Sequence, residues 1–135
     1  MSEINLKVKI DNEETEPLLD IYSIEKILIN SLKKLGKSGD FEVEISFVSE
    51  AEIERLNKKY RGINKPTDVL SFPQPELKLS YNLLGSIVIC GKIANERGED
   101  IEQLLKHGLL HLLGYDHDND EIGWDIAAEK IDCSF

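Results

Sequence analysis

The sequence predicts an α/β fold (α+β) in which one mixed, four-stranded sheet packs with about five helices. Three observations lead to this prediction. Two segments alternate apolar and polar residues, as half-buried strands do. Other segments space their apolar residues at helical intervals, and one continuous apolar run is typical of a strand buried on both faces. The order strand, helix, strand, helix, then strands, then helices favours a single layered domain over residues 1–135.

The expected strands cover residues 4–10, 41–48, 69–72 and 84–90, and the expected helices cover residues 18–35, 49–60, 93–97, 100–113 and 119–132. Apolar residues occupy every second position of the first two strands, so they share one face. The first helix follows Pro17 and ends in lysines before Gly36, which is typical of a helix end. Ser49 and Glu52 have the spacing of a capping box, which predicts that the second helix begins there.

The second half of the chain is expected to begin with a loop. Gly62 and Pro66 interrupt regular secondary structure there, so residues 61–68 should connect the second helix to the short third strand. Residues 74–83 are polar and contain a proline, which predicts a surface excursion. The fourth strand follows, and three helices complete the chain. The fourth helix carries an apolar stripe that should face the core, formed by Ile101, Leu105, Leu109 and Leu112.

The composition favours an acidic cytoplasmic protein. The formal net charge is -10, which argues against a broad electrostatic grip on nucleic acid but leaves room for a small basic site. No apolar run approaches the roughly 20 residues that span a bilayer, so no membrane association is expected. The first residues lack the apolar centre of a signal peptide. Two cysteines in a cytoplasmic chain are expected to be reduced, and Cys90 should be a buried apolar residue.

All three histidines of the chain fall in the stretch HGLLHLLGYDH, residues 107–117. His107 and His111 are four residues apart on an expected helix, so they share one face and can bind one metal ion. Gly114 can end this helix in a left-handed conformation, and the chain can then return His117 as a third ligand. Three protein nitrogens with an open fourth position are typical of a catalytic zinc site.

The spacing matches the metzincin pattern H-E-x-x-H-x-x-G-x-x-H except at the glutamate, where this chain has Gly108. That glutamate is the general base of zinc peptidases, so the chain keeps the metal scaffold without the peptidase base. Single histidines on such a helix are usually core or surface residues, but three at ligand spacing favour a metal. We expect zinc, and nickel, copper or iron remain alternatives.

A basic cluster in the middle of the acidic chain is the second candidate feature. It consists of Lys58, Lys59, Arg61 and Lys65. The lysines could simply be a solvated helix end, favoured by the helix dipole. Arg61 lies beside Gly62, where a guanidinium can offer a planar fork to a phosphate. Asp68 could cap the loop or hold a ligand histidine by its second nitrogen, and Asp116 is a rival for that second role.

Three segments together resemble the YbeY family of bacterial metal-dependent endoribonucleases, which are linked to ribosomal RNA maturation and ribosome quality control. The segments are YRGINKPTDVLSFP, LGSIVIC and HGLLHLLGYDH, within residues 56–117. The resemblance implies a zincin-like site on a helix, with zinc on His107, His111 and His117, and an important arginine at Arg61. One departure is Ser86, because the family usually has an acidic residue at this position.

The function that the resemblance implies is a zinc-dependent, single-strand-specific endoribonuclease acting in rRNA processing, including maturation of the 16S 3′ end. Arg61 would hold the phosphate and offset charge in the transition state, and Lys59 and Lys65 would contact the RNA. The expected partners are single-stranded RNA or rRNA and the small ribosomal subunit, with the chain acting as a monomer.

Two other functions remain open from the sequence. One is a non-enzymatic ribosome-assembly factor whose metal only holds the fold. The other is a metal-dependent hydrolase of another substrate, although Gly108 argues against a peptidase. Trp124 and the last helix are interpreted as packing elements.

Overall fold

The computed structural model describes residues 3–11, 19–74 and 82–134. In chain order its elements are β1 (Ile4–Asp11), α1 (Ile21–Lys34), β2 (Gly39–Phe47), α2 (Glu50–Arg61), β3 (Val69–Pro73), β4 (Asn82–Ile89), α3 (Gly91–Glu96), α4 (Ile101–Leu112) and α5 (Glu121–Lys130). Each predicted element is present with slightly shifted ends. Residues 82–83 belong to β4 and not to the predicted excursion, whereas residues 75–81 and Pro17 lie outside the described residues.

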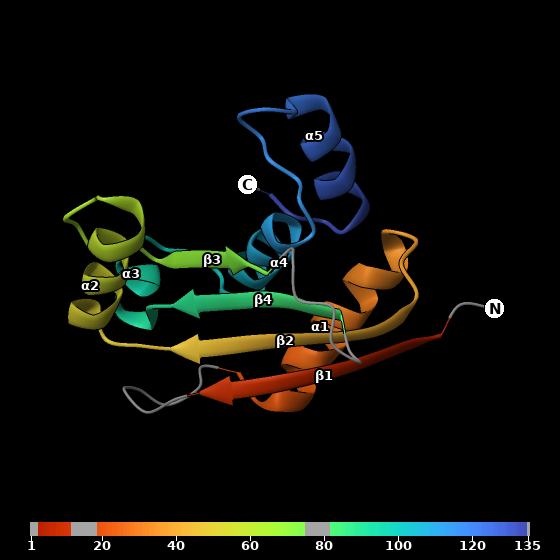
Figure 1. Cartoon of the computed structure of the whole chain (residues 1–135), viewed down its shortest axis with the longest axis horizontal. Coiled ribbons are helices and arrows are strands. Elements are labelled where there is room, and N and C mark those ends of the chain that lie inside the picture. Colours follow the sequence, from red (N-terminus) through yellow and green to blue (C-terminus); the bar gives the residue numbers. More distant parts are fainter. Residues whose placement is uncertain (1–2, 12–18, 75–81, 135) are drawn as a thin grey trace.

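The four strands form one sheet in the order β1-β2-β4-β3 (Figure 1). β1 pairs in parallel with β2, and β2 pairs in parallel with β4. β3 pairs antiparallel with β4 and is an edge strand. The prediction of a mixed, four-stranded sheet is therefore confirmed. The helix α1 connects two parallel strands, as such crossovers require.

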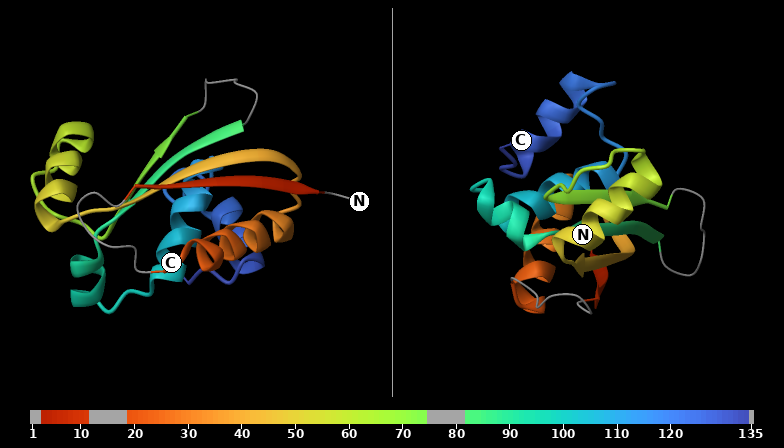
Figure 2. Two further views of the ribbon diagram at one scale, coloured as in Figure 1. Left: turned by 90° about the horizontal axis from the view of Figure 1, so that it is seen from below. Right: turned by 90° about the vertical axis from the view of Figure 1, so that its left-hand side faces the viewer.

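Helices cover the two faces of the sheet unequally (Figure 2). α1 and α4 cover one face, where the predicted stripe of α4 packs against apolar residues of β2 and β4. At the centre of this core, Ile45, Ile87 and Leu105 are fully buried. α2 covers only one end of the other face, where Ile53 packs on a smaller cluster that includes the buried Cys90. No helix in the described part of the chain combines the length and apolarity needed to cross a bilayer.

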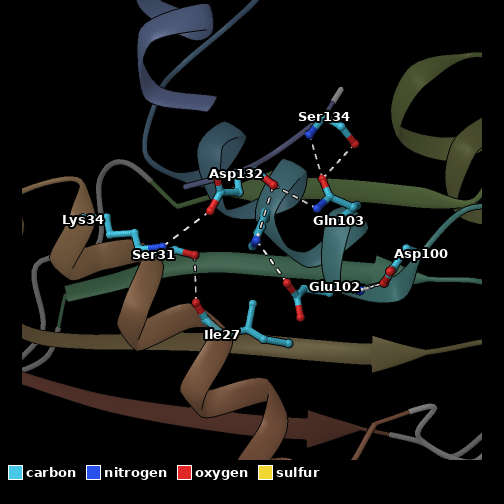
Figure 3. Close-up of polar contacts among 9 residues, drawn as sticks. Ile27, Ser31, Lys34, Asp100, Glu102, Gln103, Asp132 and Ser134 are labelled. Carbon is cyan, nitrogen blue, oxygen red and sulfur yellow. Dashed lines mark hydrogen bonds and ion pairs between the residues drawn. The ribbon is translucent and has the colours of Figure 1, made fainter. Parts of the chain in front are cut away.

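The C-terminal segment is tied to α4 by side chains (Figure 3). Gln103 Nε2 donates to the carbonyl oxygen of Asp132 at 2.9 Å, and its Oε1 accepts from the backbone amide of Ser134 at 2.7 Å. Lys106 is 8% exposed and forms an ion pair with Glu102, with 3.1 Å between Nζ and Oε2. The two Gln103 bonds hold the residues after α5 against α4, and Trp124 of α5 is buried in a cluster that includes Leu110 of α4.

Candidate functional site

A cleft of about 310 Å³ is lined by the end of α2, the strand β3, the helix α4 and the loop that follows α4. Its lining residues are Arg61, Val69, Ser71, His107, His111, Asp116, His117 and Asp118. The structure thus gathers all three histidines with Arg61 and Asp116 of the predicted site. The lining does not include Lys59, Lys65 or Asp68.

The helix α4 fixes the first two histidines. It begins at the N-cap Asp100, whose side chain accepts from the amide of Glu102 at 2.8 Å, and its apolar stripe faces the sheet. His107 and His111 point together from the remaining face, with 3.1 Å between their Nε2 atoms. Two nitrogens bound tetrahedrally to zinc at 2.0–2.1 Å would lie about 3.3 Å apart. The spacing of this pair therefore fits a zinc ion.

The electrostatics of the cleft keep both imidazoles neutral. Burial is the main cause that lowers the pKa of His107 from 6.5 to about 4; nearby His111 and His117 act in the same direction, and Asp68 acts against them. Burial also lowers the pKa of His111, while Asp116 acts in the opposite direction. A neutral imidazole has a nitrogen lone pair that can bind a metal. Both side chains are therefore in the protonation state that metal binding requires at neutral pH.

His117 lies on the loop after α4 and faces the other two rings. Gly114 has a φ of 95° and ends the helix as predicted, so the chain turns back toward the cleft. The centroid of the His117 ring is 6.3 Å from that of His107 and 6.0 Å from that of His111. Its Nδ1 is 3.2 Å from Oδ1 of Asp118. Among the described residues no three His, Cys, Asp or Glu side chains converge as metal ligands. A three-histidine site would thus require the His117 ring to move toward the other two.

Trp124 contacts all three histidines, a role that the sequence did not indicate. It is 2% exposed, and its ring centroid lies 5.2, 5.0 and 5.1 Å from those of His107, His111 and His117. The predicted packing role is therefore correct, but the packing is against the candidate ligands. The contact joins α5 to α4 and the following loop, and no motif in the sequence marks it. The indole thus limits the orientations that the three imidazoles can adopt.

At Gly108, which occupies the position of the peptidase glutamate, α4 packs tightly on β4. A Cβ atom on Gly108 would lie only 2.9 Å from Cγ2 and 3.0 Å from Cδ1 of Ile87. Ile87 is fully buried and its β-branched side chain is stiff. A glutamate at this position would meet the sheet and not the cleft. The geometry agrees with the inference that the chain lacks the peptidase base.

Arg61 is the last residue of α2, which Gly62 caps with a left-handed backbone. It lines the same cleft as the histidines, and it forms no ion pair with the residues that the structure describes. Asn57 holds the loop that follows, because its Nδ2 donates to the carbonyl oxygen of Lys65 at 2.9 Å. Asn57 is 4% exposed and was not predicted, since its partner lies eight residues away across a turn. Lys59 Nζ lies 5.2 Å from the centroid of the Tyr60 ring.

The predicted supporting carboxylates and Ser86 have other partners. Asp68 Oδ1 is 3.4 Å from Nη1 of Arg97. Asp116 accepts from the amide of Asp118 at 2.9 Å and from the side chain of Asn119 at 2.7 Å, so it orders the loop that carries His117. Ser86 Oγ donates to a carboxylate oxygen of Glu44 at 3.1 Å and is not part of the cleft lining.

Comparisons with known proteins extend beyond the segments that carry the sequence resemblance. A family model described as Endoribonuclease YbeY matches residues 7–130. The endoribonuclease YbeY of Aliarcobacter butzleri is 45% identical over 87% of this chain and 84% of its own. That of Alkaliphilus oremlandii is 38% identical over 93% of both chains. The solution structure of TM1509 from Thermotoga maritima has a similar fold, with a TM-score of 0.57 and 30% identity over 93% of this chain and 87% of that one.

Proposed function

The chain belongs to the YbeY family of endoribonucleases, and from this premise we propose that it is a metal-dependent hydrolase that cleaves phosphodiester bonds in single-stranded RNA. One observation carries the proposal. Two neutral imidazoles with Nε2 atoms 3.1 Å apart line one cleft together with Arg61, which has no ion-pair partner in the described structure. A metal site beside a phosphate-binding cation is the combination that phosphodiester cleavage uses.

The proposed metal ligands are His107, His111 and His117. Their donor set consists of three imidazole nitrogens, which suits zinc and also nickel or another divalent transition metal. When bound, zinc supplies Lewis-acid chemistry that polarises a phosphoryl oxygen and increases the acidity of water. Trp124, packed against all three rings, keeps the imidazoles grouped. Asp68 and Asp116 act on the histidines electrostatically and are proposed to orient them.

Arg61 is proposed to bind the phosphate of the cleaved bond. Its guanidinium can donate two parallel hydrogen bonds to phosphate oxygens and offset the charge that develops in the transition state. Lys59 and Lys65 flank Arg61 outside the cleft, where they would contact neighbouring phosphates of the RNA. The attacking group is either water or a ribose 2′-hydroxyl, and the proposed metal site suits either nucleophile.

The proposed biological role is rRNA processing in the cytoplasm, including maturation of the 16S 3′ end and ribosome quality control, by a chain that acts as one domain and as a monomer. The net charge of -10 supports a substrate presented by the small ribosomal subunit. An acidic protein with one basic cluster has little nonspecific affinity for RNA. A ribosomal partner would then position the RNA at the cleft.

The test is cleavage of a structured RNA that carries a single-stranded 3′ extension, by zinc-loaded protein and by an identically purified His107→Ala variant. We expect cleavage within the extension by the wild type alone. Casein is incubated in parallel, and it should remain intact because Gly108 replaces the peptidase base. Equal RNA cleavage by both proteins would show that the cleavage does not depend on His107 and would contradict the proposed site. No cleavage by zinc-loaded wild type would favour a ribosome-assembly factor with a structural metal.

A further inference from the structure

An exposed aromatic ring belongs to Tyr60, the residue immediately before Arg61 in the chain. The side chain of Tyr60 is 58% exposed, which is a large apolar surface to leave in contact with solvent. Its position is nevertheless defined, because its ring meets Phe72 edge to face, with 5.2 Å between centroids and 63° between planes. Phe72 itself packs against the smaller core cluster. The ring is thus held in a defined position while more than half of the side chain is exposed, and the flexible Lys59 side chain lies over it.

The charge around this ring suits a polyanion. Residues 57–65 hold four of the chain's 16 lysines and arginines and no aspartate or glutamate. Lys59 Nζ lies 5.2 Å from the centroid of the Tyr60 ring, so a cation accompanies the aromatic surface. A basic groove interleaved with aromatic rings is the arrangement that proteins use to bind single-stranded nucleic acid. In a chain with a net charge of -10, this combination singles out the segment as the RNA-facing surface.

The ring and the cleft lie on opposite sides of the edge strand β3. Val69 and Ser71 of β3 line the cleft, and Phe72 points to the opposite face because successive side chains of a strand alternate. Tyr60 therefore lies just across β3 from the cleft. β3 is the edge strand of the sheet, so no further strand blocks the way between the two faces.

We propose that the Tyr60 ring is a stacking platform for an unpaired base of the RNA, next to the nucleotide whose phosphate Arg61 binds. The inference rests on the proposed function, since it assigns a base subsite to the same cleft. Stacking is available to every base, so the subsite would favour unpaired over paired RNA without selecting a sequence. It therefore gives a structural reason for single-strand preference, because a base in a duplex cannot leave its stack to meet the ring.

The experiment measures KM and kcat of zinc-loaded protein on an RNA with a single-stranded extension, for the wild type, Tyr60→Phe and Tyr60→Ala. Tyr22→Ala is the matched control, because Tyr22 is 81% exposed on α1, away from the cleft lining. We expect Tyr60→Ala to raise KM at least about fivefold with little change in kcat, since stacking contributes to binding and not to the chemical step. Tyr60→Phe and Tyr22→Ala should behave like the wild type.

Two further measurements separate stacking from charge. The increase in KM caused by Tyr60→Ala should be the same at low and high salt, whereas the effect of Lys59→Ala should shrink as salt rises. RNAs with one abasic nucleotide should identify a single position where the wild type loses affinity and Tyr60→Ala does not.

The outcomes distinguish the two proposals. Wild type that neither binds nor cleaves RNA would overturn the proposed function and this inference together. Only the stacking platform would be overturned if the wild type cleaves RNA and Tyr60→Ala leaves KM unchanged. The same holds if Tyr60→Ala is as sensitive as the wild type to every abasic position. An equal loss in Tyr60→Phe would also overturn it, because phenylalanine keeps the stacking face.

Discussion

Gly108→Ala should destabilise the fold although alanine is the better helix former. In α4 the added Cβ would lie 2.9–3.1 Å from three side-chain carbons of Ile87, well inside ordinary contact distance. Overpacking of this kind costs about 1–3 kcal/mol, and alanine recovers about 1 kcal/mol of helix propensity over glycine. The free energy of unfolding should therefore fall by about 1 kcal/mol, which corresponds to a decrease in Tm of about 3–5 °C for a chain of this size.

The assay is a double-mutant cycle with Ile87→Ala, measured by urea denaturation. Ile87→Ala removes the three carbons that the new methyl group meets. In that background Gly108→Ala should become stabilising by up to about 1 kcal/mol, since only the helix propensity remains. If Gly108→Ala changed the free energy of unfolding equally in the wild type and in the Ile87→Ala background, the close approach of α4 to β4 would be refuted.

Three further predictions concern the site. Trp124 is the only tryptophan of the chain and packs on all three histidines, so copper bound there should quench its fluorescence in the wild type and much less in His111→Ala. Asn57→Ala should lower the free energy of unfolding by about 1 kcal/mol, as judged by denaturation. It should also lower kcat/KM, because the carbonyl oxygen of Lys65 loses its donor. Metal-free protein should lose stability as the pH falls from about 6.5 toward about 4, since in this range only the unfolded chain protonates His107. In melting curves His107→Gln should show a smaller loss, and an equal loss would contradict this cause.

Sequence patterns predicted the elements of the fold and a mixed sheet, but not the order of the strands in that sheet. The alternation in residues 41–48 placed Val43 and Ile45 on one face, and both are fully buried there. The position of β4 between β2 and β3 could not be predicted. It depends on pairing of Ile87 with Ile45 on one side and Ser71 on the other, and these residues are far apart in the sequence. Periodicity shows which face of the sheet a residue occupies, but not which strands pair with its own.

For the candidate site, too, local sequence patterns predicted some features, and tertiary packing determines the others. The spacing of His107 and His111 and the turn at Gly114 are local, and the structure brings both imidazoles together as that spacing predicts. The contact of Trp124 with these rings depends on tertiary packing, and so does the close approach of Gly108 to Ile87. Each joins α4 to a different element, α5 or β4, so no motif within α4 reports it.

The most direct test of metal-dependent cleavage measures zinc content and RNA cleavage on the same samples. Metal-free protein is titrated with zinc, and His107→Ala and His117→Ala are titrated in parallel. We predict that cleavage by the wild type rises with added zinc and reaches its maximum at one equivalent per chain, while neither variant gains activity. Full cleavage without metal, or a variant as active as the wild type, would contradict the three-histidine metal site.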